Sequence, residues 1–167
     1  MTSTVITPED IVAAGRAISL TSTVVADWAG RGTPRQREYL HGFLTAEHAS
    51  RQQARQARLL TAARLPARKS LDGYDWTAIR FPDGYGRDQL TSLEFLEHAG
   101  DLVFYGDVGT GKTHLACALV AAACQQHIPA RFHTTASLVA QLRHAKNTDR
   151  LEKELAALSR YQLLAID

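Results

Sequence analysis

The chain has 167 residues, of which 45% are hydrophobic and 22% charged, and its formal net charge is +2. This composition is that of an ordinary globular protein and argues against global disorder, while the length suits one α/β domain with a small appendage rather than two full domains. No run approaches the ~20 apolar residues of a membrane span, and the first residues lack the pattern of a secretory signal, so we expect a soluble, cytoplasmic protein without membrane contacts.

The cysteines and histidines indicate neither a redox centre nor a transition-metal site. Cys117 and Cys124 lie in a predicted helix, where their spacing separates the Cα atoms by roughly 10 Å, farther than the about 7 Å that a disulfide allows. We expect both to be small core residues. His41 and His48 have no nearby ligand set, and His114 is expected to belong to the helix after a glycine-rich loop.

Charge is distributed unevenly along the chain. Residues 31–69 hold nine basic side chains against two acidic ones, a balance of +7, whereas residues 70–113 hold three basic and eight acidic side chains, a balance of −5. Each arginine that neutralises a phosphate releases counterions, so this basic segment could bind duplex DNA independently of its sequence. A solvated helix face is the alternative interpretation of the same residues.

The first half of the chain is predicted to be helical. Residues 7–10 (Thr-Pro-Glu-Asp) carry the cap, proline and acidic residues of a helix start, and we expect one helix from there to about Trp28. Residues 33–36 (Thr-Pro-Arg-Gln) form a capping box ahead of a second, long helix to about Arg64. We assign residues 1–69 to a helical arm that is basic from residue 31.

An ordered linker is predicted over residues 70–86. Its aromatic side chains stand among Asp, Gly and Pro, and they carry enough apolar area to pack against the next domain. These aromatic residues are Tyr74, Trp76, Phe81 and Tyr85.

Helices and strands alternate from Arg87 onward, which predicts an α/β core over residues 87–167 with parallel strands covered by helices. The expected elements are a helix from Arg87 to Gly100, a strand at 102–105, a helix at 115–124, a strand at 131–134, helices at 138–145 and 151–158, and a strand at 163–166.

A glycine-rich loop follows the predicted strand 102–105 and precedes a predicted helix, which is the context that a Walker A motif requires. Its glycines let backbone N–H groups curl around phosphate oxygens, Lys112 neutralises phosphate charge, and the Thr113 hydroxyl is a ligand for Mg²⁺. We therefore predict that ATP with Mg²⁺ binds at Gly106, Asp107, Val108, Gly109, Thr110, Gly111, Lys112 and Thr113.

A second part of the nucleotide site is predicted at Asp167. This aspartate ends the apolar strand 163–166, as the Walker B acid that holds the magnesium shell does. An ATPase of this class also needs an acid beyond that aspartate to orient the attacking water, and often an arginine from a neighbouring subunit. The sequence stops at Asp167, so we interpret the chain as a truncated form that binds ATP and hydrolyses it poorly, with Lys112 as its only catalytic residue and an incomplete sheet.

The motifs resemble those of the IstB-like ATP-binding proteins, helper ATPases of insertion-sequence transposition in the AAA+ superfamily that are related to DnaC and DnaA. The resemblance covers roughly residues 35–167. It rests on residues 106–116 (GDVGTGKTHLA), 132–139 (FHTTASLV), 159–167 (SRYQLLAID), 65–71 (LPARKSL) and 74–76 (YDW).

This resemblance implies a P-loop NTPase of AAA+ type that assembles on double-stranded DNA in an ATP-dependent way, forms homo-oligomers as the full-length family does, and works with a transposase. Together with the basic charge of the arm, it leads us to assign DNA binding to Arg51, Arg55 and Arg58. One departure is Asp107, which stands where the family usually has proline and places an acid near the phosphates.

Three alternative functions remain open from the sequence. A DnaC-like replicative helicase loader belongs to the same superfamily and would bind the replicative helicase. A small P-loop kinase would need a lid with arginines after the core, and the basic arm argues against it. A non-catalytic remnant would bind DNA or a full-length partner through the arm alone.

Overall fold

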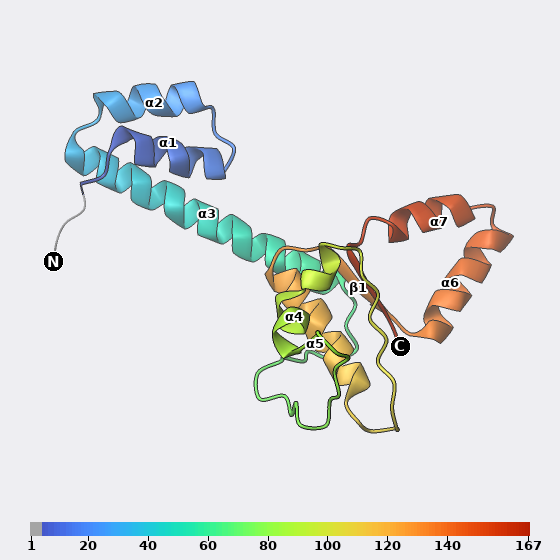
Figure 1. Cartoon of the computed structure of the whole chain (residues 1–167). Helices are drawn as coiled ribbons and strands as arrows, with labels where there is room; N and C mark the ends of the chain where they lie inside the picture. Colours follow the sequence, from blue (N-terminus) through green and yellow to red (C-terminus); the bar gives the residue numbers. More distant parts are fainter. Residues whose placement is uncertain (1–4) are drawn as a thin grey trace. The chain divides into compact units, whose positions relative to one another are not determined.

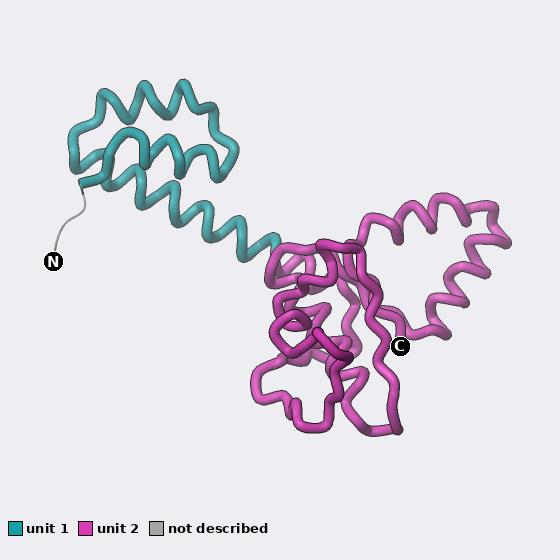
Figure 2. The backbone as a smooth tube through the Cα atoms, viewed as in Figure 1, with its two compact units in different colours: residues 1–55 teal, residues 56–167 magenta. Residues whose placement is uncertain are grey.

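The computed structural model describes residues 5–167 of the chain. The described residues divide into two compact units, with the boundary after Arg55 (Figure 2). Figure 1 shows that the first unit is helical and that the second combines helices with a small parallel sheet. This mixed architecture is the α/β class expected of a P-loop NTPase.

The first unit is built on α1 (Pro8–Ala17), α2 (Ser22–Arg31) and the beginning of α3 (Pro34–Ala62). Its buried core contains Ile11, Ile18, Val25, Ala29 and Leu44. The predicted cap residue Thr7 and the predicted capping box at Thr33 are confirmed, and Thr7 also forms a capping box with Asp10. The Thr7 hydroxyl accepts from the Asp10 amide at 3.3 Å, and the Thr33 amide donates to the Gln36 side chain at 2.8 Å.

The single helix predicted to run to Trp28 is wrong, because the chain reverses between α1 and α2. Ser19 adopts a left-handed φ of 62°, and the Leu20 amide donates to the Gly15 carbonyl at 2.9 Å. The reversal lets the apolar stripes of two short helices bury each other, which one continuous helix could not do. Gly15 permits the close approach, since a Cβ there would lie 3.1 Å from a methyl group of Val25.

The second unit is organised around α5 (Lys112–Gln125), which packs against both strands of the sheet. β1 (Ala130–His133) and β2 (Leu163–Ile166) are parallel and paired in register, and α6 (Thr135–Asn147) and α7 (Leu151–Leu158) connect them. The predicted strand 163–166 is confirmed, and β1 is shifted by one residue from its predicted position.

Two predictions for the second unit are wrong. The helix expected from Arg87 to Gly100 is broken into α4 (Arg87–Ser92) and a 3₁₀ turn (Glu94–Leu96), because Leu93 between them is left-handed with φ 65°. Residues 102–105 are extended, but they form no strand, since no neighbouring chain within the described residues pairs with them.

The aromatic linker packs against the core of the second unit, as predicted, through Tyr74, Trp76, Phe81 and Tyr85. The Tyr74 and Trp76 rings meet edge to face with centroids 5.0 Å apart, and the Arg87 guanidinium lies over the Trp76 ring at 5.0 Å. Such contacts add to the area that the rings bury and hold the linker in one position.

The two cysteines are confirmed as core residues. Cys117 and Cys124 are 1% and 0% exposed on α5, and both are free thiols. Across residues 5–167, no helix combines the length and the apolar character needed to cross a lipid bilayer.

Candidate nucleotide-binding site

The glycine-rich loop lies immediately before α5, and three of its glycines have positive φ angles. These angles are 144° at Gly106, 85° at Gly109 and 87° at Gly111. A residue with a Cβ is strained in such conformations, whereas glycine adopts them readily. The loop therefore curls tightly in front of the N-terminal end of α5, where free backbone N–H groups favour an anion.

The Lys112 side chain folds back over this loop. Its Nζ donates to the carbonyls of Gly106 at 2.9 Å and Asp107 at 2.8 Å, and the Thr110 hydroxyl also donates to the Asp107 carbonyl at 2.8 Å. The ammonium group is thus held at the mouth of the loop, in reach of an anion bound there. Val108, at the tip of the loop, is fully exposed.

Thr113 and Asp167 meet, although 54 residues separate them in the sequence. The Thr113 hydroxyl lies 3.0 Å from both carboxylate oxygens of Asp167. The backbone of Asp167 is fixed by β1 and α6: its amide donates to the His133 carbonyl at 3.0 Å, and its carbonyl accepts from the Thr135 amide at 2.7 Å. A hydroxyl and a carboxylate are the hard oxygen ligands that Mg²⁺ prefers.

The loop amides, the Lys112 ammonium and this oxygen pair fit a nucleoside triphosphate with Mg²⁺. The positive groups belong to the loop and the start of α5, and the anionic group follows β2. The two kinds of ligand therefore come from different elements that the sheet and α5 bring to one place.

A cavity of about 530 Å³ adjoins the loop. The sequence did not predict this cavity. Linker residues Tyr74, Ile79 and Arg80 line one part of it, and Tyr105 and Thr110 line another. The aromatic and basic residues of the linker were visible in the sequence, but their spacing gave no sign that they lie beside the loop.

Tyr74 connects the linker to the glycine-rich loop. Its hydroxyl donates to the Gly111 carbonyl at 3.4 Å, and its ring meets the His114 ring edge to face at 5.1 Å. The Ser70 carbonyl lies 3.1 Å from the His114 ring nitrogen Nε2. Burial, and secondarily the charge of Asp75, raise the pKa of Tyr74, so its hydroxyl stays protonated.

The arginines assigned to DNA differ in their surroundings. The Arg51 guanidinium donates to Glu47 at 2.7 Å and to the Ile18 carbonyl at 2.9 Å, so it helps hold the α1–α2 turn against α3. Arg55 and Arg58 are exposed on α3. Part of the hydrogen-bonding capacity of Arg51 is therefore used within the first unit.

Comparison with known proteins decides the family. The model of the family described as IstB-like ATP binding protein matches residues 25–167. This chain belongs to that family. The IstB-like assignment predicted from the loop and strand motifs is therefore confirmed, and with it the ATP-binding character of the family.

Three relatives are named as ATP-binding proteins of insertion sequences. The IS5376 protein of Geobacillus stearothermophilus is 32% identical, over 87% of this chain and 58% of its own length. The IS21 protein of Pseudomonas aeruginosa is 36% identical, over 78% of this chain and 49% of its own length. The IS232 protein of Bacillus thuringiensis is 36% identical, over 61% of this chain and 41% of its own length. The chain thus spans about half the length of the curated relatives it matches.

Proposed function

We propose that this IstB-like chain binds Mg²⁺-ATP and uses the bound nucleotide to control its assembly on duplex DNA during transposition of an insertion sequence. The observation that carries the proposal is the meeting of the glycine-rich loop, Lys112, and the Thr113–Asp167 pair at one place. The names of the relatives favour insertion-sequence transposition over replicative helicase loading.

Each part of the site has a distinct task in this proposal. The loop amides and Lys112 neutralise the phosphates, and Thr113 and Asp167 hold Mg²⁺. The cavity lined by Tyr74, Ile79 and Arg80 accepts the purine base. When bound, Mg²⁺-ATP supplies a γ-phosphate whose presence distinguishes the ATP state from the ADP state.

Contacts of the linker with the loop and with α5 can transmit a structural change caused by nucleotide binding to the rest of the second unit. Tyr74 contacts both the Gly111 carbonyl and the His114 ring, one on the loop and one on α5. A change in the loop on nucleotide binding therefore acts directly on the linker. We infer that this contact couples nucleotide state to DNA assembly.

The basic arm supplies the DNA-binding charge in the proposal. Arg58 is the clearest residue to test, because it is exposed and Arg51 is partly used in holding the α1–α2 turn. Lys153 is an exposed cation on α7, outside the basic segment, and provides a matched control for the same change of charge.

The test is the affinity for a fluorescent duplex of arbitrary sequence, measured over a series of salt concentrations with Mg²⁺-ATP, with Mg²⁺-ADP and without nucleotide. We expect tighter binding with ATP than with ADP. We also expect Arg58→Glu to reduce the salt slope by about 1 or more, and Lys153→Glu to leave it unchanged. Equal affinity in the two nucleotide states, or equal slopes for the two variants, would contradict the proposal.

A further inference from the structure

The last turns of α3 belong to the second unit, which begins at Gln56. A helix leaves its last carbonyl groups without partners inside the helix, and these groups carry the negative end of the helix dipole. Two carbonyls at the end of α3 accept hydrogen bonds from β1. Nη1 of Arg131 donates to the Ala62 carbonyl at 2.7 Å, and the Phe132 amide donates to the Ala63 carbonyl at 2.9 Å. β1 therefore fixes the end of α3.

Arg131 caps this helix end and forms no ion pair. Its side chain is half-buried, and no acidic side chain in residues 5–167 pairs with it. Its other contacts are with Tyr161, whose hydroxyl accepts a hydrogen bond from Nη1 at 3.4 Å and whose ring centroid lies 5.7 Å from the guanidinium carbon. A half-buried cation with neutral partners is stabilised by the negative end of a helix. Arg131 thus joins α3, β1 and the residues that precede β2.

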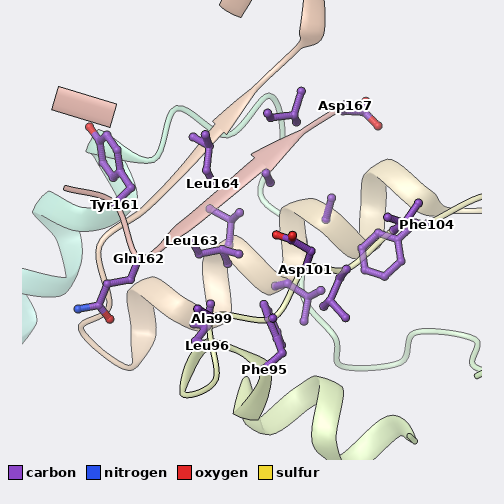
Figure 3. A pocket seen from close by; sticks show the side chains of 18 of the residues that line it. Phe95, Leu96, Ala99, Asp101, Phe104, Tyr161, Gln162, Leu163, Leu164 and Asp167 are labelled. Atoms are coloured by element: carbon purple, nitrogen blue, oxygen red, sulfur yellow. The ribbon is translucent and has the colours of Figure 1, made fainter. Parts of the chain in front are cut away.

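The last residue of β1 holds Asp167, which the proposed function assigns to Mg²⁺. The His133 carbonyl accepts from the Asp167 amide at 3.0 Å, and the Asp167 carboxylate meets the Thr113 hydroxyl. Figure 3 shows Tyr161 before β2 and Asp167 after it, at opposite ends of the strand. His133 is buried. Of residues 131–133, the first two therefore hold the end of α3, and the third holds Asp167.

Arg58, the exposed residue that the proposed function assigns to DNA, lies in the helical turn that Arg131 caps. It is four residues before Ala62, so the two are neighbours on one face of α3. A shift of the helix at Arg58 therefore moves the Ala62 carbonyl and its bond to β1. Of the two bonds between this helix end and β1, only that of Arg131 comes from a side chain, so a substitution can remove it.

We propose that Arg131 is a positioning residue that couples DNA bound at Arg58 to Mg²⁺-ATP bound at Asp167. This inference rests on the proposed function and adds a residue through which the two ligands affect each other. DNA stabilises one position of the end of α3, Arg131 transmits that position to β1, and the His133 carbonyl orients Asp167. The effect is reciprocal, because a coupling free energy between two sites acts equally on both ligands. It is separate from the Tyr74 contact, which responds to the loop.

The test is the ratio of the dissociation constants for duplex DNA measured with Mg²⁺-ADP and with Mg²⁺-ATP, which we expect to be about 5 or more in the wild type. Arg131→Met removes the donors and the charge but keeps an unbranched stem, and it should bring this ratio to within about twofold of 1. Its affinities for DNA without nucleotide and for ATP without DNA should stay as in the wild type, which a loss of folding would not allow. Arg160→Met removes the same charge from an exposed position and should keep the wild-type ratio.

Hydrogen exchange of the wild-type chain tests the same coupling without a variant, and it decides the question should Arg131→Met not fold. Mg²⁺-ATP should slow exchange of the Phe132 amide, which bonds to the end of α3, by about threefold or more. Duplex DNA without nucleotide should slow exchange of the Asp167 amide, which bonds to His133. Each ligand acts on the distant amide because β1 holds both bonds.

The possible failures of this inference and of the proposed function are distinguishable. A wild-type ratio of 1 would contradict the proposed function and this inference with it. A wild-type ratio above 1 that Arg131→Met preserves would overturn the role of Arg131 alone, as would unchanged exchange at both amides. A smaller salt slope of DNA binding in Arg131→Met would also overturn it, because Arg131 would then contact DNA phosphates itself.

Discussion

Replacement of Gly111 by alanine tests whether the loop and the linker are packed as the structure has them. Gly111 has φ 87° and ψ 10°, a left-handed conformation that costs a residue with a Cβ about 1–2 kcal/mol. The new Cβ would also lie 2.9 Å from the Tyr74 hydroxyl oxygen. Displacement of the tyrosine adds about 1 kcal/mol through overpacking. We therefore expect Gly111→Ala to lower the free energy of unfolding of the second unit by about 2–3 kcal/mol.

Measuring Gly111→Ala in the Tyr74→Phe variant separates the backbone contribution to the loss of unfolding free energy from the contribution of the tyrosine contact. In Tyr74→Phe, the nearest remaining ring atom lies 3.6 Å from the new Cβ, an ordinary contact distance, so only the backbone cost of about 1–2 kcal/mol should remain. Urea unfolding followed by Trp76 fluorescence, with Trp28→Phe in every variant, reports the second unit. An equal cost in both backgrounds would show that Tyr74 does not cover Gly111. A cost below about 0.5 kcal/mol would show that the left-handed conformation is not required.

Asp167→Asn should weaken ATP binding in the presence of Mg²⁺ and leave ATP binding in EDTA unchanged, as measured with a fluorescent ATP analogue. Equal losses of affinity in both conditions would show that Asp167 does not hold the metal. Leu44→Ala, at a side chain 1% exposed, should destabilise the first unit by about 2–5 kcal/mol in urea unfolding. Hydrogen bonds from the Thr7 amide and hydroxyl lower the pKa of Asp10, so Asp10 stabilises α1 above its unfolded pKa of about 4, and this stabilisation is lost as pH falls. Thr7→Ala should raise that pKa, as measured by NMR titration.

Local signals in the sequence predicted the elements that local interactions determine. The helix cap at Thr7 and the capping box at Thr33 depend on residues three positions apart, and both are present. The apolar run 163–166 forms a strand at the predicted positions because its neighbour β1 is available to pair with it. The loop before α5 was visible because its glycines follow a fixed spacing.

The features that the sequence did not reveal depend on distant partners. The reversal at Ser19 occurs without a glycine or proline at that position, because the packing of α1 on α2 outweighs local helix propensity. Residues 102–105 have the composition of a strand, but pairing needs a neighbouring backbone that the described residues do not provide. The cavity beside the loop brings Tyr74 and Arg80 next to Thr110, a proximity that no short motif encodes.

Calorimetric titration of the chain with a non-hydrolysable ATP analogue in Mg²⁺ measures directly whether residues 106–113 bind the phosphates. Lys112→Ala should weaken binding by about tenfold to a hundredfold, because a charge-assisted hydrogen bond to phosphate is lost, and Lys153→Ala should bind as the wild type does. Circular dichroism spectra should be the same for all three proteins, which shows that each variant is folded. Equal affinity of Lys112→Ala and the wild type would contradict the assignment of residues 106–113 as the phosphate-binding loop.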